Sequence, residues 1–210
     1  MTRCLPALAA SVLLAAPSLS LAEEVTYDFQ DPKAVNGVSF INDSPLEPFV
    51  GFGQGVAGTV DYDADAPESF SGGISVAADT LRVTNDQMTQ HMLSPGWLDA
   101  TEGKAFEAVF DEVTEVAEAD GGAVVLAVKG KLRYGAVEVD KTYTIEATLQ
   151  EGGAAERGPK NAKGDLLVLR SDFTVDRIDF GFKPEMGTDE VAQKIYVMVR
   201  IVGYEAGAMD

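Results

Sequence analysis

The sequence predicts an all-β protein whose strands form a sandwich or a closed barrel. Apolar and polar residues alternate along most of the chain, most clearly at residues 143–149, and this pattern is typical of half-buried antiparallel strands. Short turn sequences rich in glycine, proline and aspartate separate the alternating runs, for example at residues 63–67. No stretch shows the strand-then-helix alternation of a parallel sheet. We therefore expect antiparallel strands around one apolar core.

The runs that alternate in this way are the expected strands. Within the run at residues 105–116 the apolar phase slips, which predicts a bulge or a bend near Asp111 and Glu112. The expected strands are residues 25–29, 37–41, 55–62, 73–79, 105–116, 122–134, 143–149, 165–169, 176–182 and 193–202.

Three segments depart from the simple alternation. Residues 193–202 are apolar on both faces, as in a strand that is covered on both sides. Residues 85–93 have the pattern of a short helix, the only one that we expect. Residues 152–164 are polar and glycine-rich, which predicts a surface loop.

The first 22 residues are typical of a secretory signal peptide. Arg3 gives a positive start, residues 5–21 are almost wholly apolar, and small residues at Ser20 and Ala22 suit a signal peptidase. The apolar run is too short and wrongly flanked for a good membrane span. We expect cleavage after Ala22, which leaves residues 23–210 as one exported domain.

The chain is strongly acidic, with 34 Asp and Glu against 16 Lys and Arg and a formal net charge of −18. This charge makes nucleic acid and anionic membranes poor partners, and we expect at most transient membrane contact. The only cysteine, Cys4, lies in the signal peptide, so the mature chain has neither disulfide nor thiol. Its stability must come from an ordinary core, which a domain of this size supplies by burying about 70% of its unfolded surface.

Several motifs occur in a characteristic order. GTVDYD at residues 58–63 leads into a turn, an alternating strand at residues 74–80 ends in Asp-Thr, HMLS follows at residues 91–94, and RIDFG lies at residues 177–181. Their order and spacing resemble the YceI-like family of exported lipid-binding proteins. The chain departs from that family where Met88 and Thr89 replace an Arg-Asp pair and where two other histidines are missing, so it resembles a divergent member.

The resemblance implies an extended, antiparallel, eight-stranded β-barrel of the lipocalin type with one short helix. It also implies a long apolar pocket that holds a polyisoprenoid chain, such as that of an isoprenoid quinone. Packing in the core is the commoner role for any single large residue, but together these residues are our candidates for the pocket: Phe40, Phe49, Phe52, Val60, Ile74, Leu93, Trp97, Phe106, Phe110 and Phe180. A homodimer also fits the resemblance, and residues 193–202 would then either contribute to it or be covered within the monomer.

The polar candidates are expected to be structural or to lie at the pocket mouth. His91 is the only histidine, and we place it on the short helix at one end of the barrel with Ser94, bonded to backbone or to a neighbouring polar group. No Gly-x-Ser-x-Gly motif and no mature cysteine accompany it, so we expect no catalytic residue and no enzyme. Arg177 and Asp179, two apart on an expected strand, favour a structural ion pair over a ligand clamp.

No metal site is expected, and no cofactor apart from a bound lipid. Asp61, Asp63 and Asp65 imitate the first ligands of a calcium loop, but Ala66 and Gly72 stand where its glycine and glutamate belong. A solvated turn is the better interpretation. Zinc is disfavoured because one histidine and no mature cysteine leave only carboxylates as further ligands.

Two functions fit these observations. The favoured one is periplasmic binding, storage or transport of an isoprenoid lipid. Burial of each CH₂ group of the lipid tail is favourable by about 0.8 kcal/mol relative to water, so such a tail exchanges with a bilayer and not with water. The alternative is an exported stress or interaction protein whose barrel is filled by its own side chains and whose acidic surface binds a cationic partner. A cavity too small for an apolar chain would favour the alternative.

Overall fold

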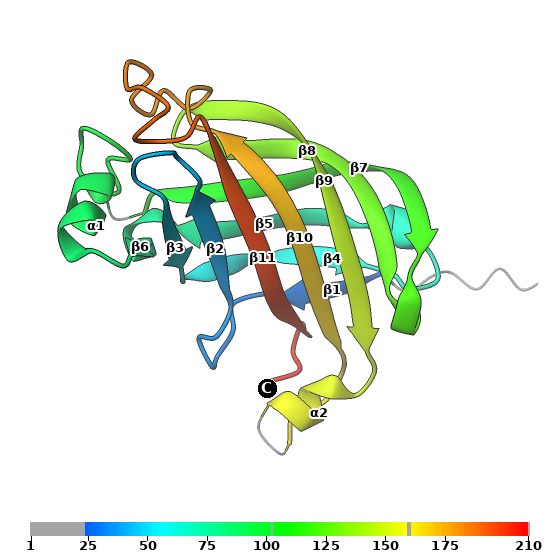
Figure 1. The fold of residues 1–210 in the computed structure, drawn as a ribbon. Helices are drawn as coiled ribbons and strands as arrows, with labels where there is room; N and C mark the ends of the chain where they lie inside the picture. Colours follow the sequence, from blue (N-terminus) through cyan, green and yellow to red (C-terminus); the bar gives the residue numbers. More distant parts are fainter. Residues whose placement is uncertain (1–23, 102, 159–160, 210) are drawn as a thin grey trace, which may run out of the picture.

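The computed structural model describes residues 24–101, 103–158 and 161–209, so the predicted signal peptide lies outside the described residues. Its strands form one antiparallel sheet (Figure 1). They are β1 (Val25–Asp28), β2 (Gly37–Asn42), β3 (Phe49–Gly53), β4 (Val56–Tyr62), β5 (Ser71–Ala77), β6 (Arg82–Val83), β7 (Ala105–Glu118), β8 (Val124–Tyr134), β9 (Val137–Gln150), β10 (Leu166–Asp176) and β11 (Lys194–Glu205). The helices are α1 (Asp86–Leu93) and α2 (Gly153–Arg157), with short 3-10 turns at Pro67–Ser69, Ala78–Thr80 and Asp120–Gly122.

Pairing of β1 with both β4 and β11 closes the sheet into a barrel. The closed ring runs β1-β4-β5-β7-β8-β9-β10-β11, and β2, β3 and β6 extend it from the first half of β11. This confirms the predicted eight-stranded, lipocalin-like barrel. The extension arises because β11 is long enough to pair with β2 at Tyr196–Arg200 and with β1 only near its end.

Local sequence accounts for the best-predicted elements. The register of β7 against β8 shifts between Phe110 and Glu112, which confirms the expected bulge. Helix α1 begins where expected because the Asn85 side chain accepts a hydrogen bond from Met88 N at 3.0 Å, a typical N-cap. Thr89 is buried and bonds both backbone groups of Val83, which fixes the helix against β6.

Four predictions on secondary structure were wrong or incomplete. Residues 177–182 form turns and bends and not a strand, because β10 runs on from its predicted end to Asp176 and stops there. Residues 78–80 form a 3-10 turn beyond β5. Strands β3 and β6 were missed, since the alternation in β3 is interrupted by glycines and β6 has two residues. The loop at residues 152–164 also contains the five-residue helix α2.

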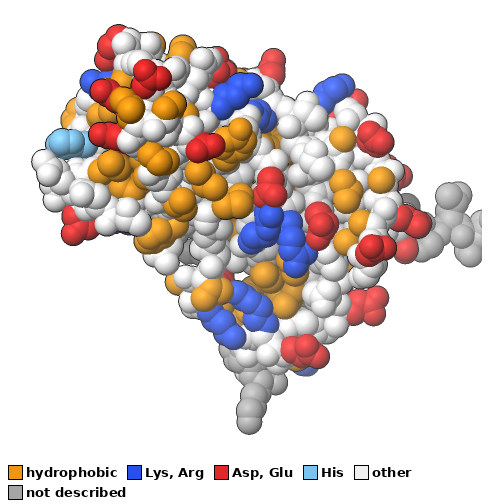
Figure 2. Space-filling view, viewed as in Figure 1, with side chains coloured by type: hydrophobic (Ala, Val, Ile, Leu, Met, Phe, Trp, Pro, Cys, Tyr) orange, Lys and Arg blue, Asp and Glu red, His pale blue; other side chains and the backbone are white. Residues whose placement is uncertain are grey.

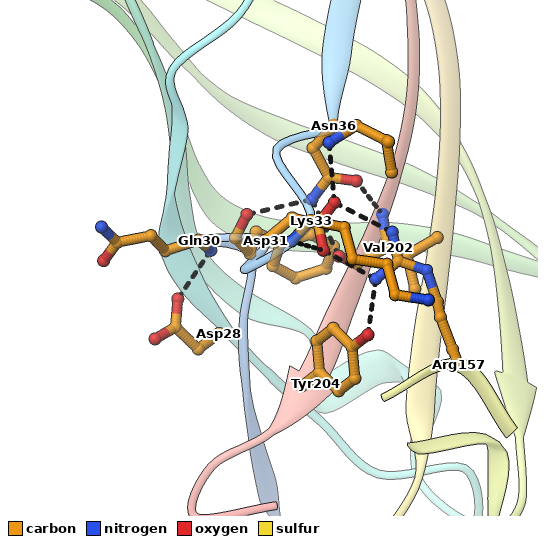
Figure 3. A network of polar contacts seen from close by, with 10 residues as sticks. Asp28, Gln30, Asp31, Lys33, Asn36, Arg157, Val202 and Tyr204 are labelled. Carbon is orange, nitrogen blue, oxygen red and sulfur yellow. Dashed lines mark hydrogen bonds and ion pairs between the residues drawn. The ribbon is translucent and has the colours of Figure 1, made fainter. Parts of the chain in front are cut away.

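A buried ion pair ties together the end of the barrel beside α2 (Figure 3). The Asp31 side chain is 1% exposed, and the Arg157 guanidinium donates to its two oxygens at 2.7 and 2.9 Å. Arg157 also donates to Tyr204 Oη at 2.7 Å. Burial alone would raise the pKa of Asp31, but the bonds from Arg157 and from the backbone N–H groups of Val35 and Lys33 outweigh it and lower that pKa to about 2.

No helix within residues 24–101, 103–158 and 161–209 is long and apolar enough to cross a membrane.

Candidate functional site

An apolar cavity of about 210 Å³ lies inside the barrel. Its wall is built from inward positions of the barrel strands, of β2 and β3, and of the segment after α1. Every lining side chain is aliphatic or aromatic except those of Ser171 and Arg177, both of which come from β10 or the residue that follows it. Such a wall offers dispersion and desolvation to an apolar ligand and few hydrogen bonds.

Most of the predicted pocket residues lie on this wall. The predicted residues that line the cavity are Phe40, Phe49, Ile74, Trp97, Phe106 and Phe110. Phe40 lies against Gly51 of the neighbouring strand, where a Cβ would come within 2.1 Å of Phe40 Cζ, so the glycine makes room for the ring. Contact of these residues with a ligand stays a prediction.

The other four predicted pocket residues lie elsewhere. Phe52 is 51% exposed on the outer face, where apolar side chains gather over the β2–β3 extension (Figure 2). It is three residues from Phe49, and side chains of opposite parity on a strand face opposite sides of the sheet. Val60 is fully buried in the main core, Leu93 packs against that core, and Phe180 belongs to a second buried cluster, so none of the three lines the cavity.

Sequence reasoning missed a chain of aromatic contacts across the cavity. The ring centroids of Tyr143 and Phe110 are 5.5 Å apart and those of Tyr143 and Phe173 are 5.3 Å apart, both edge to face. The Tyr143 hydroxyl donates to Lys131 O at 3.0 Å, and burial raises the pKa of this tyrosine above its ordinary value. The alternation at residues 143–149 did place Tyr143 on an inward face, whereas Phe173 lies beyond the strand predicted there.

Arg177 is a buried positive charge held by backbone oxygens. It is 3% exposed and lines the cavity, and its guanidinium donates to the carbonyls of Phe182, Lys183, Met186, Val191 and Ala192. Among the described residues no ion pair joins it to Asp179, which is exposed in a turn, so the predicted pair was wrong. The reason is that the two residues follow β10 and do not share a strand face.

His91 and Ser94 lie at the end of α1, away from the cavity wall. The Ser94 hydroxyl and amide both donate to His91 O, at 2.7 and 3.1 Å, and so cap the helix. The predicted place of His91 on a short helix is therefore confirmed. Its ring is exposed (Figure 2), and within the described part of the chain it makes no hydrogen bond, contrary to the bonded ring that we expected.

Because the His91 ring is exposed and makes no bond, the substitution His91→Ala is expected to change the free energy of unfolding by less than about 0.5 kcal/mol. Urea denaturation at pH 7 measures it. A loss of about 2 kcal/mol or more in the free energy of unfolding, which is the cost of leaving a buried polar group without its partner, would show that the ring has a structural partner.

Trp97 also lines the cavity, together with parts of residues 177–193, which we call the β10–β11 loop. Lys183 Nζ of this loop lies 5.8 Å from the centre of the Trp97 ring, a cation–π distance. Trp97 is the only tryptophan and lines the cavity, so its fluorescence reports on the site.

The three aspartates considered for calcium do not converge. Asp61 accepts a hydrogen bond from Thr26 Oγ1 at 2.5 Å, and Asp63 accepts one from Asp65 N at 2.8 Å. Asp63 is 7% exposed, so the expectation of a wholly solvated turn was wrong at this residue. In the part of the chain that the structure describes, no group of three or more metal-ligating side chains is placed to hold an ion.

Comparisons with known proteins agree with this architecture. BcnA of Burkholderia cenocepacia has 18% sequence identity and a TM-score of 0.59, with 80% of this chain and 95% of that chain covered. The YCEI protein of Campylobacter jejuni has 14% identity and a TM-score of 0.57, covering 74% and 84%. A polyisoprenoid binding domain from Saccharophagus degradans has 6% identity and a TM-score of 0.59, covering 87% and 99%. The search among curated proteins gave no match.

At these identities the structural neighbours show the fold alone. The family model of the YceI-like domain, by contrast, is matched by the sequence itself over residues 35–202, a range that contains β2 to β10 and most of β11. The chain therefore belongs to the YceI-like domain family.

Proposed function

We propose that the protein binds an isoprenoid lipid in the barrel cavity and stores or transports it in the periplasm. The observation that carries this proposal is the cavity itself, whose wall is apolar except at Ser171 and Arg177. The similar domain from Saccharophagus degradans is described as polyisoprenoid binding, which supports the ligand class. A binding role needs no catalytic group, and the residue that most resembled one, His91, is not on the cavity wall.

The size of the cavity limits the ligand. Its volume of about 210 Å³ is below the roughly 300–1,000 Å³ of most ligand pockets. The barrel as it stands accommodates a short isoprenoid, and a long polyprenyl chain requires the walls to move apart. A cavity of this volume also weighs against the alternative in which the barrel is filled by its own side chains.

Charge shapes how the lipid is exchanged. A net charge of −18 repels anionic bilayers, so we propose brief membrane contact during transfer and no permanent attachment. The expected homodimer stays a prediction, which light scattering of the purified protein tests.

The decisive experiment is native mass spectrometry of protein purified from its own periplasm without detergent, followed by organic extraction. A stoichiometric isoprenoid is the expected result and names the cargo. Protein that is ligand-free in repeated preparations and does not take up added isoprenoid quinone would overturn the proposal and direct attention to the acidic surface.

Filling the cavity is expected to abolish binding. The substitution Ala108→Phe places a ring in the cavity that Ala108 lines, and we expect the amount of bound lipid to fall at least tenfold while circular dichroism stays unchanged. Ala127→Phe is the matched control, because Ala127 lies between the inward residues Leu126 and Val128 and so points outward. Equal lipid content in both variants would place the ligand outside the barrel.

A further inference from the structure

One part of the barrel wall is closed by side chains and not by a backbone ladder. The pairing of β9 with β10 runs from Leu166 opposite Gln150 to Ser171 opposite Ile145 and stops there. Both strands continue: residues 137–144 pair only with β8, and residues 172–176 pair only with β11. We call these two facing segments the β9–β10 seam (Figure 1).

The polar groups of the cavity gather beside this seam. Ser171 is at the last rung of the ladder, where its hydroxyl donates to Thr144 O at 2.8 Å, and Arg177 follows the far end of β10. The guanidinium of Arg177 has every donor engaged by loop carbonyls, so it contributes charge to the wall but no free N–H. The polar side chains of the lining thus lie beside this seam, but their donors are already used.

Lys141 is a lysine at an inward position of the seam. It has the same parity on β9 as Tyr143 and Ile145, which line the cavity. Its Nζ lies 5.9 Å from the centre of the Phe173 ring, also on the cavity wall, and donates to Thr174 O across the seam. The side chain is half-buried and lies next to the cavity. Its ammonium makes a hydrogen bond between β9 and β10 where the two strands have no backbone pairing.

The Lys141 ammonium has hydrogen-bonding capacity to spare. An ammonium carries three N–H donors, and one of them is used. Within residues 24–101, 103–158 and 161–209 no carboxylate lies within ion-pair distance of it. Asp176 and Asp179 act on it from farther away, and the Asp176 carboxylate is engaged by Ile178 N and by Gln193 Nε2. Burial lowers the pKa of Lys141, so a nearby anion would offset a real desolvation cost.

We propose that Lys141 at the β9–β10 seam is the subsite for an acidic head, a carboxylate or phosphate, on the lipid whose chain occupies the cavity. This inference rests on the proposed function and specifies the ligand class of the same site. The lipid chain lies among the apolar residues. The head emerges between β9 and β10, where it accepts hydrogen bonds from the free N–H groups of Lys141. The seam has no ladder to break at this point, so a head group enters without loss of backbone hydrogen bonds.

The test compares matched ligands that differ in their heads, with Trp97 fluorescence as the readout. Farnesyl phosphate and farnesol share one chain, and dodecanoate adds the carboxylate case. We expect farnesyl phosphate to bind about tenfold or more tightly than farnesol, the effect of one charged hydrogen bond. Lys141→Met should remove this preference. Lys129→Met is the matched control, because Lys129 is the exposed outward lysine opposite Thr142 in the adjacent strand.

Each outcome decides the question. A preference for farnesyl phosphate, with or without dodecanoate binding, that is lost only in Lys141→Met supports the subsite, and dodecanoate then tells whether a carboxylate suffices. Equal affinity of the wild-type protein for farnesol and farnesyl phosphate, or equal loss of both in Lys141→Met, overturns the subsite while lipid binding stands. Failure of the wild-type protein to bind any of the three overturns the proposed function and this inference together.

Discussion

Replacing Arg177 with methionine is expected to lower the free energy of unfolding by about 3–5 kcal/mol, because several hydrogen bonds from a charged donor to buried carbonyls are lost together. The guanidinium is 3% exposed and engages carbonyls spread over the β10–β11 loop. Without it, these carbonyls either lose their donors in a buried setting or move out to water, which opens the loop. Urea denaturation at pH 7 measures the stability, and Trp97 fluorescence measures the loop.

Arg170→Met is the control for this experiment. Arg170 lies on β10, the strand that precedes Arg177, but its side chain is about half exposed, and it pairs with Glu146 on the outer face at 2.9 Å. Exposed ion pairs stabilise by about 0–1 kcal/mol, so this variant should differ little from wild type. Similar losses in both variants would mean that Arg177 contributes no more than a surface charge.

The substitution Arg157→Met is expected to cost about 3–5 kcal/mol of stability, because it leaves the buried Asp31 carboxylate without its charge partner. The Asp31 side chain is 1% exposed, so water cannot replace the two lost hydrogen bonds without local opening. Arg200→Met is the matched control: Arg200 makes the same two-bond contact with Asp172, but both side chains are about half exposed. Chemical denaturation of the two variants compares a buried with an exposed pair of the same geometry.

The same ion pair predicts a pH dependence. Because the pKa of Asp31 is lowered from 3.8 to about 2 on folding, its contribution is fully present above pH 4 and is lost as the pH falls towards 2. The shift corresponds to about 2–3 kcal/mol. We expect wild-type stability to fall over this window more steeply than that of Asp31→Asn, which has no carboxyl to protonate. Parallel pH profiles for the two proteins would contradict the lowered pKa.

Alternation along the chain was a sufficient guide wherever one face of a strand is buried. It located at least part of every strand of the closed ring and the bulge near Asp111, since the phase of the apolar residues follows the side of the sheet that they face. It was insufficient in β3, where Phe49 and Phe52 are three residues apart and therefore face opposite sides of the sheet, so only one of them faces inward. A list of large apolar residues does not show which of the two faces inward, whereas counting the parity of positions along the strand would have shown it.

The motif at residues 177–181 shows a different limit. Its Arg and Asp are spaced as strand neighbours, yet β10 ends at Asp176, and the guanidinium turns towards carbonyls of a loop that follows later in the chain. No local pattern encodes those partners, because they are backbone atoms brought together by tertiary structure. Lys141 was overlooked for a related reason: a lysine breaks an apolar face in sequence but fits at a gap in the ladder.

The sequence by itself determined the all-β class, the antiparallel strands and the helix that Asn85 caps, because these depend on the parity and capping of neighbouring residues. Only the tertiary structure decided which inward side chains leave a cavity, that Asp31 meets Arg157, and where β9 parts from β10. These features depend on residues far apart in the chain, such as Asp31 and Arg157, whose meeting is set by barrel closure and not by any local preference.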